Sequence, residues 1–204
     1  MSQARAIRLR AFVGSTEAGA VDDAVQRLRE GLTSAAPPGP RVSVEFVASP
    51  GELPDETGDA ILISSLGPEV EAAVSDWPSA EARLKRDYEA LARRGPEALF
   101  LCTVFRHVPP ELDDEARISL RLAIRRLDLL AVQLSHATAL NLIDLDRALA
   151  NAGALGLDTD YRLGGAAGAK AAGREIARAI LTAGLDAWIA PEIQERAAAA
   201  LGPA

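Results

Sequence analysis

Two hydrophobic periods alternate along the chain, one typical of strands and the other typical of helices. The segments IRLRAFV (7–13) and RVSVEFV (41–47) alternate apolar and polar residues, as half-buried strands do. The segments DAILISSL (59–66) and ALFLCTVF (98–105) are almost continuously apolar, which is typical of strands covered on both faces. The segment NLIDLDRAL (141–149) begins as a fifth strand.

Between these strands, apolar residues recur every three or four positions, which predicts amphipathic helices. The expected helices are 21–32, 79–94, 113–138, 169–184 and 191–202. Strands that alternate with helices predict an α/β fold, with five parallel strands between helical layers.

The chain has 204 residues, which suffices for one core and is short for two. We therefore expect one domain over residues 1–204, with residues 185–204 as a C-terminal helical tail. Trp188 and Ile193 in this tail are apolar anchors, either for the body of the domain or for a second subunit in a homo-oligomer.

In a wound parallel sheet, ligands bind beyond the carboxyl ends of the strands. The strand-end residues here are 14–16, 64–67, 103–107 and 144–147. We expect Gly14, Gly67 and His107 to lie at one edge of the sheet. The candidate catalytic or ligand-binding residues should lie along the same edge.

Four segments carry a resemblance to a known family: DAILISSLG, LFLCTVFRHVP, RLAIRRLDLLAVQLSHATALNLIDLDRALA and TDYRLGGAAGAKAAGREIA. Their order and their strand-end glycines resemble those of the SGNH (GDSL-type) hydrolases, over roughly the whole chain. The resemblance implies a flavodoxin-like three-layer sandwich. It also implies descent from esterases, lipases and acyl-ester hydrolases.

The first family block is Gly-Asp-Ser, in which serine is the nucleophile. Here it reads Gly14-Ser15-Thr16. An ungapped match places Thr16 at the nucleophile, whereas a slip of one residue makes Ser15 the nucleophile. Read without the family, Ser15 is a turn residue whose hydroxyl caps the loop before the first helix.

The third family block is Gly-x-Asn-Asp, whose asparagine helps to hold the oxyanion. Here it reads Gly67-Pro68-Glu69-Val70. Glu69 is an anion at neutral pH, so it would repel a developing oxyanion instead of stabilising it.

The last family block pairs an aspartate with a histidine three residues later. Asp160 matches the aspartate, and Leu163 then falls at the histidine. The other register pairs Asp158 with Tyr161. Neither register supplies a base that takes a serine proton as imidazole does.

Two further strand-end residues are candidates. His107 can replace the missing base, or it is a loop histidine held by the rigid segment 108–110. Asp144 can orient a base, bind a cation, or cap the next helix, and capping is the favoured interpretation.

Two histidines and one cysteine without ligand spacing argue against a metal site, and nothing in the sequence indicates a cofactor. The segment GGAAGAKAAG (164–173) can cradle a phosphate at a helix N-terminus, with Lys170 as the cation. The favoured interpretation is that its small residues serve a tight turn and close helix packing.

Net charge and composition limit the classes of binding partner and the cellular compartment that we expect. The net charge of −7 argues against nucleic acid and anionic membranes, and no apolar run is long enough to span a bilayer. Arginines interrupt the only early hydrophobic segment, which argues against a signal peptide. A single cysteine, Cys102, inside an apolar run fits a reducing compartment, so we expect a cytoplasmic protein.

Two functions follow from the sequence. In the first, the chain is a pseudoenzyme that binds a small-molecule or protein ligand in the former active-site cleft. Its cleft would include Gly14, Thr16, Gly67, Glu69, Asp144 and Leu163. In the second, it is an ester hydrolase or acyltransferase that uses Ser15 with His107 as a displaced base and Asp144 or Asp160 as the acid. The absent base at Leu163 and the absent amide at Glu69 favour the first.

Overall fold

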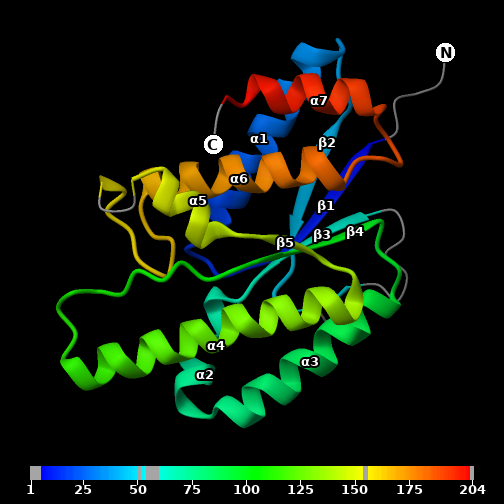
Figure 1. Ribbon diagram of the computed structural model, residues 1–204. Coiled ribbons are helices and arrows are strands. Elements are labelled where there is room, and N and C mark those ends of the chain that lie inside the picture. The colour runs from blue at the N-terminus through cyan, green and yellow to red at the C-terminus, as the bar shows by residue number, and fades with distance from the viewer. Residues whose placement is uncertain (1–5, 50–51, 54–59, 154–155, 203–204) are drawn as a thin grey trace.

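The computed structural model describes residues 6–49, 52–53, 60–153 and 156–202, and its described strands form one parallel sheet (Figure 1). The strands are β1 (Ile7–Phe12), β2 (Val42–Phe46), β3 (Ala60–Ser65), β4 (Ala98–Cys102) and β5 (Asn141–Ile143), in the order β2-β1-β3-β4-β5. The predicted five-stranded parallel sheet is confirmed. Because all strands run the same way, the turns after β1, β3 and β4 lie at one edge, as expected for Gly14, Gly67 and His107.

Helices cover both faces of the sheet (Figure 1). One layer contains α1 (Ala18–Ala35), α6 (Ala166–Ala183) and α7 (Pro191–Ala200), and the other contains α2 (Val70–Ser75), α3 (Trp77–Arg93) and α4 (Asp114–Thr138). The 3₁₀ turn η2 (Gly67–Glu69) precedes α2, and α5 (Leu145–Asn151) follows β5. The sequence did not predict η2 or α2, and it gave no bounds for α5, because pieces of three to seven residues are too short to display a helical period.

The core has two halves, one on each face of the sheet. Ile61 and Ile63 of β3 pack into the half beneath α1 and α6, and Leu62 packs into the half beneath α3 and α4. All three side chains are fully buried. Burial on both faces explains why β3 and β4 read as continuous apolar runs.

The C-terminal tail packs on the body of the domain. Ala197 of α7 is fully buried, and a Cβ added to Gly31 of α1 would lie 3.3 Å from the Ala197 carbonyl oxygen. Trp188 and Ile193 are half-buried against the same half of the core. Trp188 and Ile193 therefore anchor the tail to the body of the domain, which is one of the two alternatives that the sequence left open.

The small residues of α6 let it approach α1 closely. A Cβ added to Gly173 would lie 2.7 Å from the carbonyl oxygen of Ala20 and 2.5 Å from Oδ2 of Asp23. These separations leave no room for a methyl group, so the glycine is required by packing, as the run of small residues indicated.

We expect Gly173→Ala to lower the free energy of unfolding by roughly 1–3 kcal/mol, because the methyl group pushes two closely packed helices apart. Gly19→Ala is the matched control, since Gly19 lies in the facing helix α1 and its added Cβ meets nothing closer than 3.8 Å. The control should be neutral or slightly stabilising in urea unfolding. Equal stabilities of the two variants would contradict the close packing of α1 on α6.

Candidate functional site

A buried carboxylate ties together the turns that follow β1 and β3. Glu17, just before α1, is 4% exposed. Its Oε2 accepts a hydrogen bond from the Gly14 N–H (2.8 Å), and its Oε1 accepts one from the Ser65 hydroxyl (2.5 Å). Ser65 Oγ in turn accepts from the Gly67 N–H (3.0 Å). Burial raises the pKa of Glu17, although the hydrogen bonds from Ser65 and Gly14 act in the opposite direction.

Two strand-end glycines make this arrangement fit. A Cβ at Gly14 would lie 3.2 Å from Oε2 of Glu17 and 3.3 Å from the ring of Pro68, and a Cβ at Gly67 would collide with the same carboxylate. Both glycines are therefore explained by the approach of a side chain to the backbone.

The two hydroxyl residues of the same turn point outward. Ser15 and Thr16 are exposed, and among the described contacts neither hydroxyl forms a hydrogen bond. Thr16 lines a cavity of about 540 Å³, whereas Ser15 is not one of its lining residues. Activation of either hydroxyl as a nucleophile needs an adjacent base.

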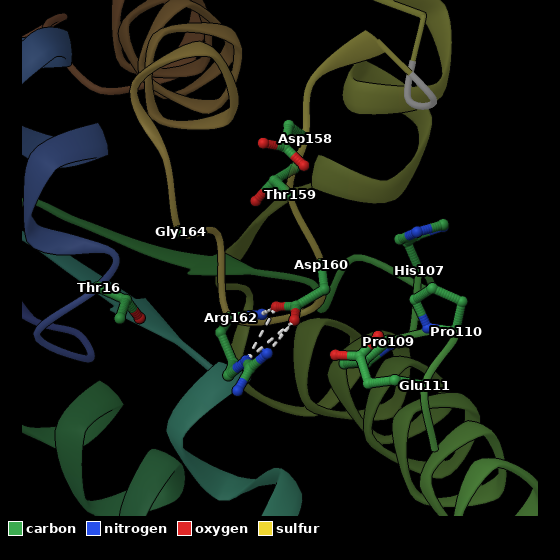
Figure 2. A pocket seen from close by; sticks show the side chains of 10 residues that line it. All are labelled: Thr16, His107, Pro109, Pro110, Glu111, Asp158, Thr159, Asp160, Arg162 and Gly164. Carbon is green, nitrogen blue, oxygen red and sulfur yellow. Dashed lines mark hydrogen bonds and ion pairs between the residues drawn. The ribbon is translucent and has the colours of Figure 1, made fainter. Parts of the chain in front are cut away.

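The cavity lies where the turn after β1 meets the chain after β4 and the segment that leads into α6 (Figure 2). Its lining residues are Thr16, His107, Pro109, Pro110, Glu111, Asp158, Thr159, Asp160, Arg162 and Gly164. It thus gathers four residues that the sequence singled out, namely Thr16, His107, Asp158 and Asp160, and it lies at the predicted edge of the sheet.

Asp160 is engaged by Arg162. Its Oδ1 accepts hydrogen bonds from the backbone N–H of Arg162 (2.9 Å) and from the guanidinium Nε (3.0 Å). Burial opposes ionisation of Asp160, but the bonds from Arg162 outweigh it and lower the pKa of the carboxyl. Asp160 is therefore an ionised carboxylate whose partner is an arginine.

The His107 ring stacks on Phe105, with centroids 5.9 Å apart. Its backbone carbonyl accepts a hydrogen bond from the Tyr161 N–H (2.8 Å). Figure 2 shows the ring directed away from Thr16, with the Asp160–Arg162 pair between the two residues. No described hydrogen bond joins the ring to Ser15, Thr16 or Asp160, so the catalytic set of Ser15, His107 and Asp160 stays a prediction.

Leu163 lies in the core and not on the cavity wall. It is 2% exposed and packs in the half of the core beneath α1 and α6. Its backbone is left-handed, with a φ of 55°, and its N–H donates to the Asp160 carbonyl (2.9 Å). The turn from 160 to 163 therefore directs a hydrocarbon side chain inward at the position where the resemblance expects an imidazole.

Glu69 also faces away from the main cavity. Nη1 of Arg83 donates to its Oε1 (3.3 Å), and a second guanidinium nitrogen contacts Oε2. Glu69 and Gly14 line a different and smaller cavity of about 160 Å³ beside Tyr88. Arg83 of α3 balances the charge of Glu69, so Glu69 neither repels nor stabilises an anion in the larger cavity.

Asp144 caps α5, as the favoured interpretation held, because its Oδ1 accepts from the Arg147 N–H (3.0 Å). Asp146 accepts from the Arg106 N–H (2.9 Å) and from the Arg106 guanidinium, which fixes the chain just before His107.

Within the described residues, no group of three or more His, Cys, Asp or Glu is arranged to hold a metal ion. None of the described helices has the length and hydrophobicity to cross a membrane.

Asp128 is a second acid that sequence reasoning missed, and it is partly buried. It lies on α4 and accepts a hydrogen bond from the Val104 N–H (2.9 Å). Burial raises its pKa to about 7, with help from the charges of Asp146 and Asp144. The available signal was a lone acid in the apolar stretch LDLLAVQL.

Comparison with solved structures identifies the fold. The chain is similar to a member of the lipolytic protein G-D-S-L family from Veillonella parvula DSM 2008 (TM-score 0.55, 13% identity, covering 86% of this chain and 97% of that chain). It is also similar to the acetyl xylan esterase AlAXEase (0.56, 14%, 83% and 98%) and to a lipase/acylhydrolase from Enterococcus faecalis (0.52, 18%, 85% and 95%).

These likenesses show that the chain has the α/β fold of the GDSL (SGNH) hydrolases, as its resemblance implied. No family model and no curated protein matches the chain. The identities of 13–18% establish the fold, so the chemistry has to be argued from the cavity itself.

Asp128→Asn tests whether this partly buried acid is protonated in the folded protein. An unfolded aspartate has a pKa of about 3.9, so between about pH 4 and pH 7 the folded state holds a proton that the unfolded state lacks. The stability due to this proton is fully present below pH 4 and is lost as the pH rises through 7. Asparagine keeps an acceptor for the Val104 N–H without the charge.

We therefore expect Asp128→Asn to be more stable than the wild type at pH 8 by on the order of 1–2 kcal/mol, and to differ much less at pH 5. Urea unfolding at both values measures this. A stability difference that does not change with pH would show that Asp128 is ionised in the folded protein throughout this range.

Proposed function

We propose that this chain is a non-hydrolytic protein with an SGNH-type fold, which binds a neutral, hydroxyl-rich small molecule in the 540 Å³ cavity. The observation that carries the proposal is Leu163. At the position where the resemblance expects the general base, the chain places a buried hydrocarbon side chain in the core.

Chemical reasoning supports loss of hydrolysis. A positioned general base contributes about 10²–10⁴-fold to such reactions, and an oxyanion donor contributes about 10²–10³-fold. The nearest substitutes are engaged elsewhere: Glu69 is paired with Arg83, and Asp160 is paired with Arg162. An exposed Ser15 without a partner base is then an ordinary alcohol.

The charges that line the cavity disfavour an anionic ligand. Glu111, Asp158 and Asp160 contribute three carboxylates, and Arg162 is the one guanidinium among the lining residues. This excess of negative charge repels anions. Carboxylates accept hydrogen bonds from ligand hydroxyls, and the hydroxyls of Thr16 and Thr159 both donate and accept.

A sugar or another polyol therefore fits the lining better than a phosphate or a carboxylic acid. One structural neighbour is described as an acetyl xylan esterase. Xylo-oligosaccharides are for that reason sensible first probes of the cavity.

The second candidate is an ester hydrolase or acyltransferase. One observation favours it, because Thr16, His107 and Asp160 line the same cavity. The mechanism requires His107 to turn toward Thr16 or Ser15, until its ring lies within about 2.6–3.2 Å of a hydroxyl or is linked to it by one water. It also requires Asp160 to exchange Arg162 for the second ring nitrogen of His107.

The proposal predicts selective binding. Xylobiose should shift the backbone amide NMR signals of Asp158, Asp160 and Gly164, whereas an aldobiouronic acid of the same size should shift them much less. In the double variant Glu111→Gln with Asp158→Asn, the acid should bind at least as well as the neutral sugar, because two repelling charges are gone.

The control is Glu192→Gln with Glu195→Gln, which makes the same charge change at exposed positions of α7. The control should retain the preference for the neutral sugar. Equal binding of both sugars by the wild type, or signal changes confined to residues outside the cavity, would contradict the proposal.

A further inference from the structure

Helix α4 has apolar side chains on two opposite faces. One face is the inner one, where Leu120, Ile124, Leu127, Ala131 and Leu134 are buried against the sheet. The other carries Ile118, Leu122, Leu129 and Val132, which are 66%, 46%, 57% and 44% exposed. We call these four residues the outer stripe. A helix that is apolar on both faces is normally covered on both.

The spacing of the outer stripe is that of a coiled-coil seam. Positions 118, 122, 125, 129 and 132 follow one another at intervals of four, three, four and three residues. Arg125 occupies the central position of this series. The pattern therefore matches a surface that packs against another long helix.

We propose that the outer stripe pairs with the same stripe of a second copy of this chain, with the two α4 helices antiparallel. In the register that pairs positions 118, 122, 125 and 129 with one another, Ile118 lies opposite Leu129 of the partner subunit, and Val132 lies at the end of the seam, opposite Glu115 of the partner subunit. In the same register, Leu122 lies opposite Arg125 of the partner subunit. Each contact occurs twice, because a two-fold interface is self-complementary.

The charges along α4 favour this partner and this orientation. The first turn is acidic, with Asp114 and Glu115, whereas the last turn has no acidic residue and contains His136. Antiparallel pairing brings the acidic turn of each copy beside the C-terminal turn of the other, and it also opposes the two helix dipoles. A parallel pair would place acid beside acid.

A membrane is a weaker partner for the same stripe. Arg125 and its neighbour Arg126 would suit anionic lipid, but Asp114 and Glu115 lie on the same helix and the whole chain carries a charge of −7. Among the described residues of the stripe there is also no tryptophan or phenylalanine, the side chains that anchor interfacial helices.

The pairing should be weak and reversible. A helix of 25 residues is about 37 Å long, so a seam about 10 Å wide covers roughly 400 Å² on each copy, about half of what a stable interface buries. Two arginines, one Arg125 from each copy, also approach each other beside the two-fold axis. Arg125 is therefore a residue that limits the affinity.

Sedimentation velocity of the full chain between about 5 and 500 µM tests the pairing. The wild type should shift from monomer to dimer with concentration. Ile118→Glu and Leu129→Lys should each raise the dimer dissociation constant by roughly tenfold or more, because each change enters the seam twice. Arg125→Leu should lower it by a similar factor. Phe46→Glu changes a residue of β2 with similar exposure and should have no effect.

The register is tested by mixing the first two variants. A mixed dimer of Ile118→Glu with Leu129→Lys places the new glutamate opposite the new lysine, so mixing should restore dimerisation that neither variant shows alone. A parallel pair would not be rescued in this way.

Each of the following results would overturn the proposal: a wild type and an Arg125→Leu variant that both stay monomeric up to 500 µM, variants that dimerise like the wild type, or no rescue on mixing. Binding of the monomer to vesicles rich in phosphatidylserine, lost in Leu129→Glu, would also overturn it in favour of a membrane.

Discussion

The buried carboxylate of Glu17 is the interaction on which the ligand-facing edge of the sheet depends. A carboxyl group with 4% exposure is costly to bury unless it is hydrogen-bonded, and here its partners come from two different turns. Gly14 belongs to the turn after β1, and Ser65 and Gly67 belong to the end of β3. Satisfying one acid therefore fixes the relative position of two loops that are 48 residues apart in the chain.

This constraint also sets what the edge can do. Glu17 accepts the hydrogen bond from the Gly14 N–H at the base of the turn. Ser15 and Thr16 stay exposed at the tip of the same turn. On the far side of the cavity, the turn from Asp160 to Leu163 is held by Arg162 and by the burial of the leucine side chain. The cavity between them is lined by carboxylates, threonines and an arginine, which suits recognition of hydroxyl groups better than proton transfer from a serine.

The sequence predicted the features that depend on local periodicity. The alternation in β1 and β2 and the apolar runs of β3 and β4 were sufficient for the parallel sheet, because burial on one or two faces leaves a direct imprint on the pattern. Glu17 was missed for the opposite reason. An acid that follows Gly-Ser-Thr resembles a solvated turn residue, and its burial depends on Ser65, a partner that no local pattern reveals. The same holds for Asp128, whose partner is the backbone of Val104.

We propose that the turn from Gly14 to Glu17 does not carry an activated nucleophile. The most direct measurement is the intact mass of the protein after incubation with a fluorophosphonate, which reacts covalently with activated serines. The account predicts no stoichiometric adduct, because Ser15 and Thr16 have no base as a hydrogen-bond partner among the described residues. One equivalent of adduct on Ser15 or Thr16, lost in His107→Gln, would contradict it and would establish the displaced-base hydrolase instead.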